Sequence, residues 1–441
     1  MKARISRFKE RSWVGVWLAT CISGGLPAAI HAESLADAWA MALQSDGTMA
    51  AAHSEVEAAQ ADQSAASRQR WPALDVTGAY TQLQQSPILD IATPTGQFQS
   101  PKIWKHDAYA MGGANASLPL WTSGRLSGAI GAAAAGTRGA SAQEVRGGAA
   151  LKLAIAESYV AVFRARSALR VAESSVTSLE AHVQDVRSMY EKEAVAQSDL
   201  LAATVALANV AQQRLRASNE LRIATAAYNR GVGQPLDRIP DLDEPSAMPS
   251  VAAGEPLDQL VEHALESRPE LAATTALQEG LEQSARVERG ASLPQISLQA
   301  GYNHFDNAIL DRQNFASVGV AFQWRLFDSG QIRARTSALR SRARAAQQQL
   351  ADQRSLVALE VETALLNRED AAARIHVAAA AVTQAEDNVR IAKELYRNGL
   401  GTNTQVLDAE TLRVTALTNR DTAQFDLVIA GYRILRASGD L

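Results

Sequence analysis

The chain has one cysteine, few aromatic residues and almost no net charge, and each shortage excludes a class of protein. A single cysteine, Cys21, in 441 residues rules out a disulfide framework and a cysteine-based zinc or iron–sulfur site. A formal net charge of −4 excludes a surface that is basic throughout, so nucleic acid is not an expected partner. Aromatic residues make up only 5% of the chain, which suits long, closely packed helices better than a large globular core.

Motifs for enzyme chemistry and for metal binding are missing as well. The histidines that follow the first 32 residues are scattered, without an i, i+4 pair or a cluster of ligands. The sequence contains no P-loop, no G-x-S-x-G motif and no dinucleotide fingerprint. It therefore predicts no enzyme activity, no catalytic residue, no metal site and no cofactor.

Long hydrophobic runs are absent from the chain after its first residues. No later stretch reaches the ~18 consecutive apolar residues of a transmembrane helix, so a membrane role would have to come from strands. Residues 1–32 combine a basic head, an apolar run over Trp13–Leu26 and small residues up to Ala32, which predicts a signal peptide cut after Ala32. The alternative is a lipoprotein signal, because Leu18–Cys21 resembles a lipobox, although Thr20 departs from the usual Gly, Ala or Ser. Both alternatives take the protein out of the cytoplasm.

The sequence does contain an internal duplication. Residues 33–80 align with residues 255–302 without a gap, and Leu120–Gly124 later matches Leu326–Gly330. The first copy carries extra residues between these two matches. The interpretation is a first repeat over 33–230 and a second over 255–441. Residues 231–254 between them are rich in Pro, Gly and Asp and are interpreted as a linker.

Within each repeat the hydrophobic period changes from helix to strand and back. In the first repeat the helical pattern of Leu35–Arg70 stops at Pro72, because proline cannot continue a helix. Alternating residues then predict β-hairpins at about 74–121 and about 295–326, with strands long enough to cross a bilayer at a tilt. Two hairpins give four strands per chain, whereas bacterial membrane barrels need at least eight. If the strands lie in lipid, the chain must therefore form an oligomer.

A very long helix is predicted after each hairpin. No proline occurs from Gly124 to Tyr190, so roughly 66 residues can form one helix of about 100 Å. Its lower part has apolar residues at heptad spacing in both repeats. These residues are Val176, Leu179, Val183, Val186 and Tyr190, and then Val382, Ala385, Val389, Ala392 and Tyr396. Return helices are expected to start at Asp199 and Gln405, with Ser198 and Thr404 as N-caps. Helix pairs of this length predict a coiled-coil tube or stalk.

These elements resemble the TolC-like outer-membrane efflux family (outer membrane factors). The resemblance covers nearly all of the chain after residue 32. It rests on three duplicated motifs in order, namely Leu293–Ile296, Leu326–Gly330, and Tyr396–Thr402 followed by Val406–Ala409. It implies a mainly α fold with a β-hairpin pair and a homotrimer. It also implies a 12-stranded barrel in the outer membrane of a Gram-negative bacterium, continued by a helical periplasmic barrel.

The resemblance also implies a function and partners. The chain would be the passive exit duct of a tripartite efflux or type I secretion system, in contact with outer-membrane lipid. A periplasmic adaptor (membrane fusion) protein and an inner-membrane transporter would open it at its periplasmic tip. The alternatives are a periplasmic coiled-coil scaffold without channel activity and a porin-like uptake channel. The cargo, the pump and the adaptor do not follow from the sequence.

In this family the duct closes at its tip, where the resemblance places a pore constriction. The family's two acidic positions fall on Gln405 and Asp408, and Asp199 corresponds to Gln405 in the first repeat. A ring of carboxylates would select cations. The alternative for Asp199 is a carboxylate favoured by the helix dipole. Tyr190 and Tyr396 either lock the closed tip or fill ordinary heptad core positions. The family's basic gate position falls on Gly401.

Two further surfaces are candidates for contacts. The resemblance makes the turns docking sites for the adaptor, the alternative being that they only reverse the chain. Their residues are Glu193, Ala194 and Val195 in the first repeat, and Gly399, Leu400 and Gly401 in the second. Arg333, Arg335, Arg340, Arg342 and Arg344 form a basic stretch after the second hairpin. We interpret this stretch as a solvated helix face, the alternative being contact with anionic lipid.

Overall fold

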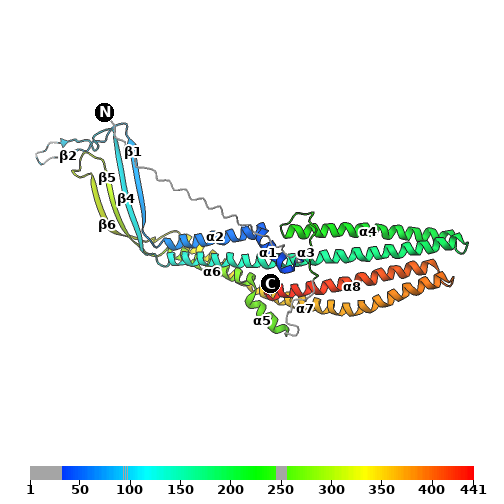
Figure 1. Ribbon diagram of the computed structural model, residues 1–441. Coiled ribbons are helices and arrows are strands. Elements are labelled where there is room, and N and C mark those ends of the chain that lie inside the picture. Colours follow the sequence, from blue (N-terminus) through cyan, green and yellow to red (C-terminus); the bar gives the residue numbers. More distant parts are fainter. Residues whose placement is uncertain (1–31, 93, 95, 97, 245–255) are drawn as a thin grey trace, which may run out of the picture.

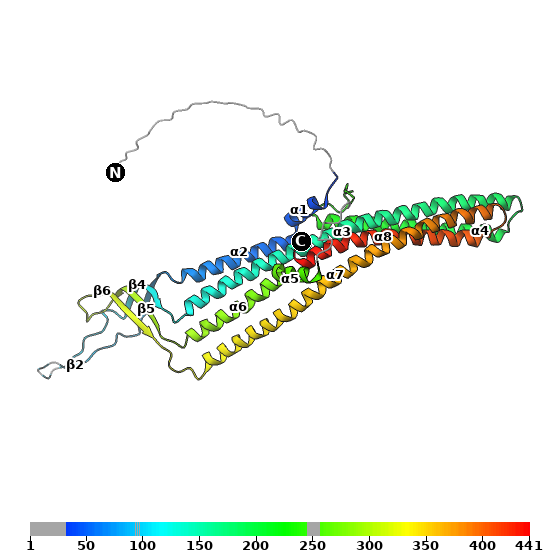
Figure 2. The same cartoon turned by 90° about the horizontal axis from the view of Figure 1, so that it is seen from below.

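The computed structural model describes residues 32–92, 94, 96, 98–244 and 256–441. Apart from Ala32, the predicted signal peptide lies outside the described residues, and so do residues 245–254 of the predicted linker. The molecule is elongated, with a small β-sheet at one end and antiparallel helices leading away from it to two helical tips (Figures 1 and 2).

The predicted hairpins join into one four-stranded antiparallel sheet with the order β1-β4-β5-β6. Its strands are β1 (Ala73–Gln82), β4 (Ala108–Trp121), β5 (Gln295–Phe305) and β6 (Asn314–Gln323). Pairing of β4 with β5 connects the two repeats. The extra residues of the first repeat form the loop between β1 and β4, which contains the short hairpin β2 (Ile91–Ala92) and β3 (Phe98–Gln99).

Four helices lead to the sheet, two in each repeat. They are α1 (Leu35–Ser45) and α2 (Gly47–Arg68), then α5 (Leu257–Ser267) and α6 (Pro269–Gly290). The helical pattern of Leu35–Arg70 is present as two helices, because Asp46 interrupts it. The extended backbone of Asp46 ends α1, and its side chain accepts hydrogen bonds from the N–H groups of Thr48 and Met49, which caps α2.

The two long helices are confirmed. Helices α3 (Arg125–Glu191) and α7 (Gln331–Arg397) each contain 67 residues, which corresponds to about 100 Å. Gly124 and Gly330 precede them with φ of 83° and 84°, a conformation that a residue with a Cβ adopts only with strain. Both helices run unbroken from the sheet to a tip.

The return helices α4 (Gln197–Gly231) and α8 (Asn403–Ser438) begin two residues earlier than predicted, so both predicted N-caps were wrong. Helix α8 is capped by Thr402, whose hydroxyl accepts from the N–H of Gln405 while the Gln405 side chain accepts from the N–H of Thr402. Thr404 has no such partner. Helix α4 follows Ala196, which provides no side-chain cap.

The apolar core follows the helices as a set of separate clusters. Near the tips Val183, Val186, Val389 and Tyr396 pack together, which confirms the heptad interpretation for these positions. At mid-length, helices α1 and α5 and residues 232–244 pack across the long helices. Glu33 joins this layer, because the Tyr159 hydroxyl donates to its carbonyl oxygen at 2.9 Å.

Candidate functional site

The four-stranded sheet has one apolar and one polar face. The strand register places Leu74 beside Ala116 and then Ala300 and Val318, all on the same face. The apolar face also carries Val76, Ile296, Leu298, Val320 and Phe322. The opposite face carries Asp75, Thr77, Asn115, Ser117, Gln299, Asn303 and Ser317. An antiparallel sheet with this alternation can separate lipid from a water-filled interior.

The apolar face is uncovered, and the sheet is open at both sides. Val76 and Val318 each expose 79% of their surface. Strand β1 pairs only with β4, and strand β6 pairs only with β5, within the part of the chain that the structure describes. The backbone N–H and C=O groups at these two edges need partners if the sheet lies in a bilayer.

Aromatic residues mark the end of the sheet that adjoins the helices. Trp71, Trp121, Trp324 and Phe327 expose 73%, 61%, 49% and 83% of their surface. We call these four residues the aromatic girdle. Trp and Tyr are enriched where a barrel crosses the membrane–water boundary. The indole Nε1 of Trp324 donates to the carbonyl oxygen of Ser292 at 3.1 Å, which fixes the girdle to the end of α6.

At the opposite end, the turns predicted to dock a partner lie at the tips of the two helical hairpins. Glu193 and Gly399 adopt φ of 61° and 71° to reverse the chain. Leu400 exposes 77% of its surface. Glu193, Ala194 and Gly399 are also exposed, while Val195 and Gly401 are half-buried.

The residues predicted for the pore constriction occupy different environments. Asp408 is exposed, Asp199 is half-buried, and the side chain of Gln405 is engaged in the cap of α8. Tyr190 exposes 38% of its surface, whereas Tyr396 exposes 3%. Tyr396 packs edge-on against His182, with ring centroids 5.3 Å apart. The two tyrosines, equivalent in the duplication, therefore have different surroundings within one chain.

A buried polar contact connects the two tips, and sequence reasoning missed it. His182 on α3 and Asn403 at the start of α8 are 1% and 4% exposed. The ring nitrogen Nε2 of His182 lies 2.8 Å from Oδ1 of Asn403, and Nδ2 of Asn403 donates to the carbonyl oxygen of Asp199 at 3.1 Å. This contact joins α3, α8 and α4. Arg397 adds a second link between the tips through Asp185, at 2.7 Å.

A second buried polar cluster lies further up the same helices. Glu410 on α8 is 2% exposed. It pairs with Lys393 on α7 at 2.7 Å and with Arg413 at 3.0 Å, and it accepts a hydrogen bond from Ser178 on α3. Burial alone would raise the pKa of Glu410, but the hydrogen bonds from Lys393 and Ser178 outweigh it and lower the pKa. Glu410 is therefore ionised and holds three helices together.

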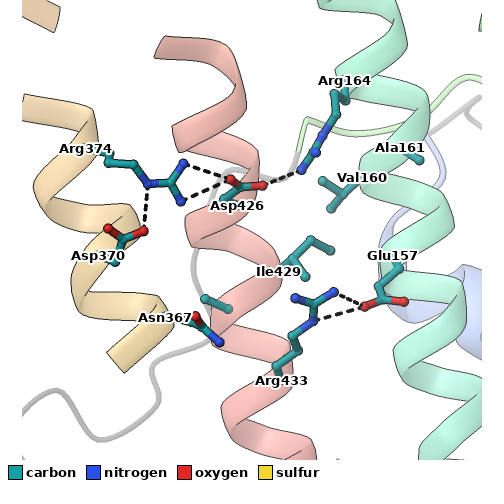
Figure 3. Close-up of a pocket in the computed structure, with 11 residues that line it drawn as sticks. Glu157, Val160, Ala161, Arg164, Asn367, Asp370, Arg374, Asp426, Ile429 and Arg433 are labelled. Carbon is teal, nitrogen blue, oxygen red and sulfur yellow. Dashed lines mark hydrogen bonds and ion pairs between the residues drawn. The ribbon is translucent and has the colours of Figure 1, made fainter. Parts of the chain in front are cut away.

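The middle of the helical wall carries a third charged group (Figure 3). Asp426 on α8 pairs with Arg164 on α3 at 2.7 Å and with Arg374 on α7 at 3.1 Å. Glu157 and Arg433 form a further pair at 2.7 Å beside a cavity of about 430 Å³. Arg374 also pairs with Asp370 at 2.8 Å, so three carboxylates face three arginines. The arrangement therefore braces three helices and leaves no net charge to attract an ion.

The histidine at the tips gives a pH prediction. Burial lowers the pKa of His182, although the Asn403 contact and the carboxylates of Asp185 and Glu410 act in the opposite direction and Lys393 adds to the lowering. The folded protein therefore holds His182 neutral while the unfolded chain gains a proton below about pH 6.5. This stabilisation is present above that pH and is lost as the pH falls.

The check is the melting temperature at pH 7.5 and pH 5.0. We expect His182→Gln, which keeps a partner for Asn403, to lose less stability on acidification than the wild type. Equal losses in the two proteins would contradict the prediction.

Within the described ranges of the chain, no three His, Cys, Asp or Glu residues are grouped so that they could hold a metal ion. None of the helices in these ranges combines the length and the apolar character required to cross a bilayer.

The fold and the two-faced sheet define a class of protein, namely an outer-membrane channel with long periplasmic helices. Residues 260–440 match the family model described as outer membrane efflux protein. The second repeat is thus similar to the TolC-like family, and the predicted location is the outer membrane of a Gram-negative bacterium, extending into the periplasm. The family is one of transport channels of tripartite efflux systems rather than of enzymes.

Known proteins agree with this assignment. The outer membrane efflux protein BepC of Brucella suis is 23% identical over 291 residues, and the match spans 64% of this chain and 61% of that protein. The outer-membrane channel OprN has a similar structure, with a TM-score of 0.79 and 19% identity over 92% of this chain and 90% of that one. VceC of Vibrio cholerae gives a TM-score of 0.78 with 19% identity, covering 92% and 96%. The predicted fold class is thus confirmed.

Proposed function

We propose that three copies of the chain join their sheets into one 12-stranded barrel and form a passive exit duct. The observation that carries this proposal is the sheet itself, which has an apolar face, a polar face and two unpaired edges. Pairing of β6 with β1 of the next copy removes every edge, and a barrel without edges is the form in which strands span a bilayer. The polar side chains then line the interior.

Unpaired apolar positions on the helices support the same assembly. On α4, Leu201, Val205 and Leu215 expose 58%, 61% and 64% of their surface and fall on one heptad stripe. On α7, Val377 and Ile391 expose 73% and 46%. Neither stripe has a partner among the described residues of one chain. We assign the two stripes to each other across the boundary between neighbouring copies.

The orientation of the wall follows from the mid-length layer. Helix α1 packs against α3, and helix α5 packs against α7 and α8. If this layer faced the interior, three copies of it would obstruct the duct. We therefore place α1 and α5 on the outside, which puts the opposite side of the long helices toward the interior.

Opening takes place at the tips in this proposal. A periplasmic adaptor and an inner-membrane transporter dock at the turns, where Leu400 is exposed, and shift the population toward an open state. Asp199 and Asp408 line the constriction, and the contacts of His182 with Asn403 and of Arg397 with Asp185 hold the tips together in the resting state. The duct serves efflux or type I secretion, with the cargo chosen by the transporter.

Planar-bilayer conductance tests the duct. We expect small, cation-selective steps from the wild type and a weaker cation selectivity from Asp199→Ala/Asp408→Ala, because the variant removes carboxylates from the narrowest point. Replacement of Glu57 and Glu55 by Ala on the exposed surface of α2 serves as the charge-matched control. If the tip variant leaves the conductance steps and their selectivity unchanged, the constriction must lie at other residues. Folded, membrane-inserted protein without conductance would favour a structural scaffold and overturn the proposal.

A further inference from the structure

A groove rich in arginine lies between α6 and α7, close to the sheet. It has a volume of about 410 Å³. Its lining consists of Glu282, Ala285, Arg286, Arg289, Arg340, Ala343, Arg344 and Gln347. Four guanidinium groups thus share one groove with a single carboxylate. Guanidinium groups are suited to phosphate because their planar donors match its oxygens.

These arginines have no acidic partner of their own. In the described part of the chain, Arg286, Arg289 and Arg340 form no ion pair, and Arg344 donates only to the hydroxyl of Ser341 at 3.0 Å. The neighbouring part of α7, from Gln331 to Ala351, contains five arginines and no acidic residue. The positive charge of the groove is therefore not neutralised within one chain.

The duplication shows that the fold does not need most of this charge. In the first repeat, Ser127, Ala129, Ala134 and Gly136 stand in place of Arg333, Arg335, Arg340 and Arg342. Arg344 corresponds to Arg138, which pairs with Glu279 of α6. Helix α3 nevertheless has the same length as α7. Arginine in the second repeat thus calls for an explanation other than helix formation.

The groove lies next to the aromatic girdle. The indole of Trp324 is hydrogen-bonded to Ser292, and Arg289 precedes Ser292 by one helical turn. Arg340 lies about 13 Å along α7 from its first residue, Gln331. Lipid headgroups extend roughly 5–8 Å beyond the hydrocarbon on each side of a bilayer. Arg289 therefore lies at headgroup depth, whereas Arg340 lies several ångströms further into the periplasm.

The groove also faces the outside of the proposed duct. Arg333 and Arg340 share a heptad position with Val361, which is buried in the same cluster as Leu260 of α5. The arginines thus follow the face of α7 that α5 covers lower down. With α5 on the outside of the duct, as the proposed function requires, the groove faces outward rather than into the channel.

We propose that this groove binds the phosphate of an anionic phospholipid in the periplasmic leaflet of the outer membrane. The proposal rests on the proposed function for the orientation of the wall, and it goes beyond it by assigning a lipid site. A juxtamembrane arginine contributes about 1 kcal/mol of attraction to an anionic surface, or about fivefold in affinity. The site would fix the depth of the barrel in the bilayer next to the girdle.

The test compares lipid selectivity at the girdle. The purified trimer is reconstituted in mixed vesicles of phosphatidylcholine and phosphatidylglycerol, with bromine on the acyl chains of one lipid at a time. Quenching of tryptophan fluorescence then reports which lipid is enriched beside the protein. We expect phosphatidylglycerol to be enriched several-fold around the wild type. Arg286→Gln/Arg289→Gln/Arg340→Gln should abolish this enrichment, because three arginines at about 1 kcal/mol each account for more than a several-fold preference.

The matched control is Arg187→Gln/Arg214→Gln/Arg216→Gln, which removes three exposed arginines from the lower parts of α3 and α4. We expect its lipid selectivity to equal that of the wild type. Unchanged selectivity in the groove variant would overturn the proposal. So would dissociation of its trimer on a native gel, since the arginines would then pair with a neighbouring copy.

Inorganic phosphate distinguishes the source of the bound group. We expect 50 mM phosphate to leave the enrichment of phosphatidylglycerol in place. Phosphate that abolishes the enrichment and raises the melting temperature as much as the lipid does would assign the groove to a soluble anion. Conductance of the groove variant should match that of the wild type, so failure of the lipid site would be separable from failure of the duct.

Discussion

Replacement of Val318 by arginine should prevent the chain from assembling in the outer membrane. Val318 lies at the middle of β6 and exposes 79% of its surface on the apolar face of the sheet. Arginine at the middle of the lipid-facing surface costs about 2–4 kcal/mol per copy, or about 6–12 kcal/mol for three copies. That is comparable with the whole stability of a typical domain. The measurement is the amount of heat-resistant oligomer in outer-membrane fractions.

The adjacent residue provides the control. Ser317 lies on the polar face of the same strand, beside Gly301 and Asn115 of its neighbours in the sheet. Ser317→Arg should assemble normally and alter only ion selectivity, because its charge faces water. Equal loss of oligomer in both variants would show that the two faces of the sheet do not differ in their surroundings, and the barrel would be rejected.

Removal of Glu410 should loosen the helices above the tips. The side chain of Glu410 is 3% exposed, and those of Lys393 and Arg413 are 19% and 13% exposed. Glu410→Ala leaves two partly buried cations without a counter-charge. Breaking a fully buried pair costs 3–5 kcal/mol, and the residual exposure of the cations reduces this to about 2–4 kcal/mol. We expect a melting temperature lower by several degrees and a larger or noisier conductance.

Asp408 is the natural comparison for Glu410, because it lies two residues away on α8 but is exposed. Asp408→Ala should change stability by less than about 0.5 kcal/mol, as surface substitutions usually do. Its effect should be limited to ion selectivity. If both variants were equally stable, the Glu410 cluster would not hold the closed form, and the basis of the resting state would lie elsewhere.

Much of the fold could be predicted from local pattern. Alternation in Ile296–Tyr302 predicted a strand, and the lack of proline after Gly124 predicted a helix of the observed length. Local pattern failed to predict helix boundaries where a single side chain determines the first residue of a helix. Asp46 interrupts an alanine-rich helical stretch by capping the next helix, and Thr402 rather than Thr404 caps α8 because only Thr402 has a glutamine three residues later.

The polar contacts at the tips could not be predicted in this way. His182 and Asn403 are 221 positions apart, and Ser178 and Glu410 are 232 positions apart. Sequence spacing carries no signal for such pairs, since it is the antiparallel packing of α3 against α8 that brings them together. The difference in burial between Tyr190 and Tyr396 could not be predicted for a related reason. The duplication makes the two positions equivalent in sequence, but only Tyr396 finds a histidine ring beside it.

That asymmetry bears on stoichiometry. If three chains close into a ring, six hairpin tips alternate around it, three with an exposed tyrosine and three with a buried one. A partner that binds both kinds of turn would have six binding sites per ring, whereas a partner that binds only the turn with Leu400 would have three. Because the two repeats of each chain have similar backbones but different side chains, the ring would have nearly sixfold symmetry in its backbone and only threefold symmetry in its side chains. Counting the bound partner copies per ring would reveal which symmetry the partner recognises.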